Sequence, residues 1–135
     1  MSNARQFVPY GRQQITESDI EAVVTVLRSD FLTTGPVTDA FEIAFANFVD
    51  APFAAVCANG TAALHLCALA LQLGPSDAVI VPTITFLATA SAPHLTGAEV
   101  YFADVEPDTG LTTPAHVLAA AKRAEADGKT VRAVF

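Results

Sequence analysis

Apolar residues recur at helical spacing in two stretches of the first 50 residues. The first stretch carries Ile20, Val23, Val24 and Leu27. Thr16 and Asp19 are the residue types of a capping box, so the pattern predicts a helix that begins after Thr16 and runs to about Arg28. Thr38 is the expected cap of a second helix, whose apolar face carries Phe41, Ala44, Phe45 and Phe48. Three phenylalanines on one face require a large partner surface.

From residue 53 onward, short apolar runs alternate with segments of helical length. The runs cover 53–57, 78–81, 99–102 and 131–135, and the helical segments cover 61–73, 86–95 and about 113–128. Thr113 and Pro114 supply a cap and a first-turn proline for the last of these helices. The alternation predicts an α/β fold with a mainly parallel sheet flanked by helices.

The composition of the 135 residues excludes several classes of function. The 14 acidic and 7 basic side chains give a net charge of -7, and the basic residues are scattered, so no nucleic-acid partner is expected. Segments 51–76 and 78–98 lack charged residues, but their prolines and polar residues argue against a membrane span. Cys57 and Cys67 have no second cysteine pair, which predicts neither a zinc site nor a disulfide framework and favours a cytoplasmic location.

The turn between the run at 53–57 and the next helix is the most informative element. Gly60 would let an anion approach the backbone, and the amides of Thr61 and Ala62 could hold a phosphate group at the helix start. The alternative is a tight turn with Thr61 as an ordinary helix cap. The seven glycines lie at least 13 residues apart, so neither a dinucleotide fingerprint nor a P-loop can be written.

Five ordered motifs resemble the DegT/DnrJ/EryC1/StrS sugar aminotransferases, which use pyridoxal 5'-phosphate (PLP). The motifs lie at 9–12, 29–36, 59–66, 82–90 and 102–109. Within this family, the opening motif and Ser-Asp-Phe-Leu-Thr-Thr-Gly-Pro most resemble enzymes of pseudaminic acid biosynthesis. Those enzymes aminate the 4-keto carbon of a UDP-linked 4-keto-6-deoxy-N-acetyl sugar.

The resemblance implies the N-terminal part of a PLP fold type I large domain, which is incomplete in this chain. Residues 1–36 would form an arm, a helix and a substrate-pocket loop, and residues 37–135 part of the PLP-binding domain. In the family's sheet, later strands separate the run at 53–57 from the next three strands. We therefore expect another chain, further sequence or a rearranged strand order to complete the fold.

The resemblance also assigns binding roles to individual residues. The cofactor phosphate would lie on Gly60, Thr61 and Ala62, and Phe86 would stack on the pyridine ring, where some relatives carry Trp. Without the family context, Phe86 would be an ordinary core phenylalanine. The nucleotide-sugar pocket would be lined by Tyr10, Asp30, Phe31, Leu32, Thr33 and Thr34. The alternative for this last group is a polar connection between two helices.

PLP chemistry requires a lysine amine that holds the cofactor as a Schiff base, and normally a carboxylate beside the pyridine nitrogen. Lys122 and Lys129 are the only lysines, and neither is expected near the phosphate turn. The resemblance places both catalytic groups beyond Phe135, so we expect this chain alone to be inactive. Asp104, Glu106 and Asp108 are typical of a solvated turn and predict no metal site.

The resemblance thus implies a homodimeric aminotransferase that transfers nitrogen from a donor such as glutamate to a nucleotide-linked keto sugar. Two alternatives stay open. One is a PLP-dependent sugar dehydratase of the same family, whose distinguishing position lies outside this chain. The other is a non-catalytic α/β module that binds a phosphorylated ligand or a partner protein.

Overall fold

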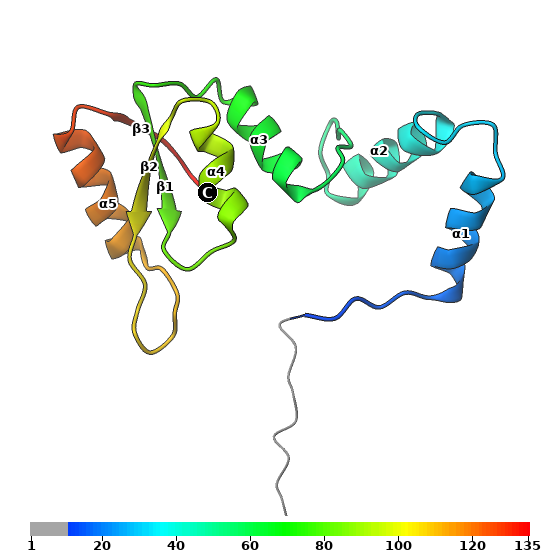
Figure 1. Ribbon diagram of the computed structural model, residues 1–135, viewed down its shortest axis with the longest axis horizontal. Helices are drawn as coiled ribbons and strands as arrows, with labels where there is room; N and C mark the ends of the chain where they lie inside the picture. The colour runs from blue at the N-terminus through cyan, green and yellow to red at the C-terminus, as the bar shows by residue number, and fades with distance from the viewer. Residues whose placement is uncertain (1–10) are drawn as a thin grey trace, which may run out of the picture. The chain divides into compact units, whose positions relative to one another are not determined.

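The computed structural model describes residues 11–135, which form two compact units (Figure 1). The boundary between the units lies between Val56 and Cys57. Tyr10, one of the expected substrate-binding residues, lies outside the described residues. Within residues 11–135, no helix has the length and hydropathy needed to cross a membrane.

The first unit contains helix α1, Glu17–Leu27, which begins and ends where the sequence predicts. Its start is fixed by the Asp19 carboxylate, whose Oδ2 accepts hydrogen bonds from the Thr16 backbone N–H at 2.7 Å and the Thr16 hydroxyl at 2.8 Å. These two bonds, the backbone one first, hold the pKa of Asp19 below its ordinary value because they favour the charged carboxylate.

Helix α2, Pro36–Phe48, begins three residues earlier than the sequence predicts. The prediction of Thr38 as its cap is wrong, because Pro36 has the fixed φ of a first helical residue and Gly35 takes the cap position at φ +142°. The phenylalanine face is exposed, with Phe48 at 87%. Phe41 and Phe45 stack with ring centroids 5.8 Å apart.

The predicted strand at 53–57 does not form in this structure. A strand needs a neighbouring strand for its backbone hydrogen bonds, and none of the described strands pairs with this run. Instead, the Val56 N–H donates to the Glu42 Oε1 at 2.8 Å, within the first unit. The family resemblance had placed later strands between this run and the next three, and the sheet of residues 11–135 contains only those three.

The second unit is built on a parallel sheet of β1, Asp77–Pro82, β2, Glu99–Ala103, and β3, Thr130–Val134. The strand order is β2-β1-β3, with Ala78 of β1 opposite both Glu99 and Val131. These strands confirm three of the predicted runs and the parallel α/β fold class.

Helices cover both faces of this sheet (Figure 1). Helix α3, Gly60–Ala70, packs against α4, Leu87–His94, while α5, Pro114–Ala126, contacts all three strands. Thr113 caps α5 as predicted.

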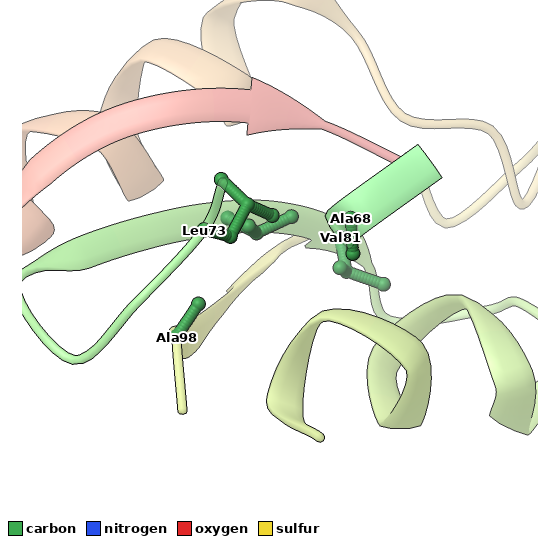
Figure 2. Packing of buried hydrophobic residues seen from close by; sticks show 5 residues of the cluster. Ala68, Leu73, Val81 and Ala98 are labelled. Carbon is green, nitrogen blue, oxygen red and sulfur yellow. The ribbon is translucent and has the colours of Figure 1, made fainter. Parts of the chain in front are cut away.

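The central strand β1 is buried on both faces, and its side chains alternate between two clusters. Val79 and Val81 join the cluster that contains Ala68 of α3, which Figure 2 shows together with Leu73 and Ala98. Ile80 points into the other cluster, against Ala120 of α5. This packing fixes β1, whose carboxyl end leads to Phe86 of the candidate site.

Candidate functional site

Helix α3 begins in a turn of small residues that the Asn59 side chain closes. Asn59 has extended backbone and is the N-cap, and its Oδ1 accepts a hydrogen bond from the Ala62 N–H at 2.9 Å. The expectation that Thr61 caps this helix in an ordinary tight turn is therefore wrong. The amide side chain of asparagine reaches the third amide of the helix, which is the usual geometry of an N-cap.

Two amides at this helix start keep their hydrogen-bonding capacity. The backbone N–H groups of Gly60 and Thr61 have no acceptor within residues 11–135, whereas the N–H of Ala62 donates to Asn59. A methyl group built on Gly60 would meet no atom within 4 Å, and both Gly60 and Thr61 are exposed. An anion can therefore reach two amides directly, and the helix dipole favours negative charge there.

Phe86 lies at the start of α4, where it is the N-cap residue. Its side chain is 76% exposed, so in this structure it is not a core phenylalanine. The short connection from β1 to Phe86 is held at its first residue, because the Thr83 N–H donates to the carbonyl oxygen of Ala103 at 2.9 Å. It is held again by the Thr85 hydroxyl, which donates to the Thr89 hydroxyl at 3.0 Å.

The turn at Gly60 and Phe86 each lie at the start of a helix, and these two helices, α3 and α4, pack against each other. Helix α3 runs roughly opposite to β1 (Figure 1). Phe86 follows the carboxyl end of β1 after Thr83, Ile84 and Thr85. In open α/β sheets, ligands bind outside the carboxyl ends of the strands.

The loop predicted to bind the sugar belongs to the first unit. Four of its five residues line a hollow beside the ends of α1 and α2, namely Phe31, Leu32, Thr33 and Thr34. Asp30 does not line it. The Ser29 hydroxyl stabilises the loop, since it donates to the Val26 carbonyl at 2.8 Å and accepts from the Phe31 N–H at 3.3 Å.

The two lysines lie away from the carboxyl edge. Lys129 precedes β3, where its ammonium pairs with Glu99 at 2.8 Å and donates to the Pro75 carbonyl at 3.0 Å. Because Glu99 begins β2 and Pro75 precedes β1, this pair marks the amino edge of the sheet. Lys122 is exposed in the second half of α5. Neither amine is near the turn at Gly60.

The carboxylates after β2 behave as solvated side chains. Asp104, Glu106 and Asp108 are exposed, and residues 11–135 hold no cluster of three or more metal-binding side chains. Glu106 has one partner that the sequence did not reveal, because its Oε1 lies 3.6 Å from the Nε2 of His116. The nine residues between them gave no periodic signal for this contact.

A second polar contact that the sequence did not reveal lies on β2. The Tyr101 hydroxyl donates to Asp127 Oδ2 at 2.9 Å. Desolvation, followed by this hydrogen bond and the charges of Asp127 and Glu99, raises the pKa of Tyr101 to about 12. The contact joins β2 to the end of α5, and we assign it a structural role.

Comparison with known proteins shows which family this chain resembles in sequence and structure. The model of the DegT/DnrJ/EryC1/StrS aminotransferase family matches residues 13–133. A protein of Streptococcus pneumoniae described as the sugar aminotransferase Spr1654, in its PLP form, is 37% identical with a TM-score of 0.71. The match covers 84% of this chain and 29% of that one.

Two further solved structures are similar. A DegT DnrJ EryC1 StrS aminotransferase from Brucella abortus is 34% identical, with a TM-score of 0.69 over 85% of this chain and 30% of that one. A GDP-4-keto-6-deoxymannose-3-dehydratase with a trapped PLP-glutamate geminal diamine is 25% identical, with a TM-score of 0.65 over 73% of this chain and 27% of that one. The chain thus spans less than a third of the length of each of these proteins.

Proposed function

This chain belongs to the DegT/DnrJ/EryC1/StrS aminotransferase family, and from that premise we propose that it forms part of a PLP-dependent sugar aminotransferase. The proposed substrate is a nucleotide-linked 4-keto-6-deoxy sugar, most specifically a UDP-linked N-acetyl sugar on the route to pseudaminic acid. Glutamate is the proposed amino donor. We also propose that the full enzyme is a cytoplasmic homodimer.

The observation that carries this proposal is the pair of unused amides at the start of α3. A phosphate group needs hydrogen-bond donors and space for its oxygens, and the N–H groups of Gly60 and Thr61 provide both. A side chain on Gly60 would occupy this space. The Ala62 amide could bind the phosphate only if Asn59 released it. In the proposal, the amides of Gly60 and Thr61 therefore make the main hydrogen bonds to the phosphate.

The exposed ring of Phe86 supports the second half of the cofactor site. An exposed aromatic ring that follows the carboxyl end of β1 can stack on a planar pyridine ring. In the proposal, Gly60 and Thr61 anchor the phosphate end of PLP, and Phe86 orients its ring. When bound, PLP supplies the electron-accepting ring that amino-group transfer requires.

The proposal also assigns the substrate-binding and catalytic roles, which Gly60, Thr61 and Phe86 do not fill. Residues 1–36 would form the arm, helix and substrate loop, with Tyr10 and residues 30–34 in contact with the nucleotide sugar. The lysine that holds the cofactor covalently, and the carboxylate beside its ring nitrogen, would come from sequence beyond residues 11–135, because Lys122 and Lys129 lie away from the turn. The chain by itself would then be inactive.

A sugar dehydratase is the second candidate function. The similarity to a GDP-4-keto-6-deoxymannose-3-dehydratase supports it, since this enzyme of related structure acts on a keto sugar with PLP. Dehydration removes a hydroxyl group from the sugar as water, whereas amination replaces a keto oxygen with an amino group. The two reactions therefore give sugar products of different mass.

The test is an assay of the full-length enzyme with PLP, glutamate and a UDP-linked 4-keto-6-deoxy-N-acetyl sugar. The proposal predicts an amino sugar by mass spectrometry, together with an equal amount of 2-oxoglutarate from the donor. Glutamate labelled with nitrogen-15 should transfer its label to the sugar. A deoxygenated product without added nitrogen would instead support the dehydratase. No change of any keto sugar, in a preparation that binds PLP, would contradict both.

A further inference from the structure

The hydroxyl group of Ser29 lies among three backbone groups where α1 leads into the loop 30–34. Its oxygen is 2.8 Å from the Val26 carbonyl oxygen, 3.1 Å from the Phe31 carbonyl oxygen and 3.3 Å from the Phe31 nitrogen. The single hydroxyl proton is donated to one of the two carbonyls at a time, while the oxygen accepts a hydrogen bond from the Phe31 N–H. The hydroxyl therefore ties the backbone of Phe31 to the last turn of α1.

Gly35 restrains Phe31 from the other end of the loop. A methyl group built on Gly35 would stand 2.6 Å from the Phe31 Cβ, so the Gly35 backbone packs against the base of this side chain. Gly35 is itself held at the start of α2, where its carbonyl oxygen accepts a hydrogen bond from the Thr38 N–H at 3.0 Å. Phe31 is thus restrained both from α1 and from α2.

The middle of the loop has no such restraint. The backbone N–H groups of Leu32, Thr33 and Thr34 have no acceptor within residues 11–135. The same three residues line the hollow beside the ends of α1 and α2. Their placement therefore depends on the two ends of the loop, where Ser29 and Gly35 lie.

From these contacts we infer that Ser29 is a positioning residue, whose hydroxyl holds the loop 30–34 in the conformation that binds the sugar. The inference rests on the proposed function, because that function assigns these residues to the nucleotide sugar. Ser29 acts through the loop, since its hydroxyl is already engaged by Val26 and Phe31. Without the hydroxyl, the loop would adopt more conformations, and binding of the sugar would have to order it.

The test compares three variants of the full-length enzyme: Ser29→Ala, which removes the hydroxyl, Ser29→Thr, which keeps it, and the control Thr25→Val. Thr25 is a matched control because its hydroxyl also donates to a backbone carbonyl at 2.8 Å, that of Glu21 in the same helix. Thr25 does not line the hollow.

Isothermal titration calorimetry of the PLP-loaded enzyme gives the dissociation constant of a UDP-linked 4-keto-6-deoxy-N-acetyl sugar. Glutamate is left out, so that the sugar binds but is not aminated. The dissociation constant of PLP is measured separately for each variant, and thermal unfolding shows whether the fold is retained.

We expect Ser29→Ala to raise the dissociation constant of the sugar by roughly 2- to 12-fold, the range that corresponds to loss of one hydrogen bond. The dissociation constant of PLP should stay the same, because the loop does not belong to the proposed cofactor site. Ser29→Thr should restore most of the sugar affinity, and Thr25→Val should bind the sugar as the wild type does.

If the wild-type enzyme binds the sugar and Ser29→Ala binds it equally well, the inference is wrong while the proposed function stands. Equal weakening of sugar binding by Ser29→Ala and Thr25→Val would show a general effect on α1 and would also contradict the inference. If the wild-type enzyme binds PLP but not the sugar, the inference and the proposed substrate are both wrong.

Discussion

The amides at the start of α3 make a quantitative prediction for Gly60→Val. The new side chain would occupy the open space at Gly60, where the cofactor phosphate is proposed to lie, and would keep that phosphate from at least one amide. A hydrogen bond to a charged group contributes about 1.5–3 kcal/mol. Since about 1.4 kcal/mol corresponds to a tenfold change in affinity, the dissociation constant of PLP should rise by roughly 12- to 140-fold.

Gly74→Val is the matched control for this substitution. A methyl group on Gly74 would also meet no atom within 4 Å, and Gly74, like Gly60, does not adopt the left-handed backbone conformation. The two substitutions therefore make similar demands on the fold, but only Gly60 lies at the helix start. Valine at Gly60 should not lower the stability of α3, because glycine is a poorer helix former than valine.

The assay is an equilibrium titration of the full-length enzyme and both variants with PLP, accompanied by thermal unfolding without cofactor. Gly60→Val should bind PLP weakly with an unchanged unfolding temperature, and Gly74→Val should bind it as the wild type does. Equal affinity in Gly60→Val and the wild type would refute the role of this turn. Equal weakening by both variants would show a general effect on the fold.

Three further predictions test other parts of the structure. Asn59→Asp should keep the helix cap but weaken PLP binding in the same titration, because it adds a negative charge beside the phosphate, whereas an unchanged affinity would place the phosphate elsewhere. Ile80→Ala should lower the free energy of unfolding by about 2–5 kcal/mol in urea denaturation, since Ile80 is fully buried, and the exposed control Ile43→Ala should have little effect. The pKa of Tyr101 is raised above its unfolded value of 10.0 to about 12, so its stabilising contribution is present below pH 10 and is lost as the pH rises through about 12. Tyr101→Phe should abolish this part of the alkaline loss of stability. An identical dependence of stability on pH in the variant and the wild type would contradict the assignment.

Local chemistry in the sequence was sufficient to predict most elements of the second unit. The pair Thr113 and Pro114 predicted the start of α5, because a side-chain cap followed by a proline acts within a single turn. The apolar run 78–81 predicted β1 for a similar reason, since a strand covered on both faces is apolar at successive positions. These signals do not depend on distant parts of the chain.

The sequence predictions that were wrong depended on interactions that short sequence patterns do not reveal. The run 53–57 has the composition of a strand, but the strand that would pair with it is not among the strands of this structure. At α2, the choice between Thr38 and Gly35 as cap depended on the backbone angle of Gly35, and at α3 the side chain of Asn59 took the position expected for Thr61. Several residue types can cap a helix, so sequence alone leaves the choice open.

The candidate site could likewise be predicted only in part from the sequence. Sequence and family resemblance selected Gly60, Thr61 and Phe86, and the structure adds that two amides are unused and that the phenylalanine is exposed. The contact between Glu106 and His116 could not be predicted, because it joins a loop to a helix and follows no periodic pattern.

The central claim is that the start of α3 binds the phosphate group of PLP. A crystal structure of the full-length enzyme with PLP bound tests it most directly. The account predicts that phosphate oxygens lie within hydrogen-bonding distance of the backbone nitrogens of Gly60 and Thr61, with the pyridine ring stacked on Phe86. A bound cofactor whose phosphate contacts neither amide would contradict the account.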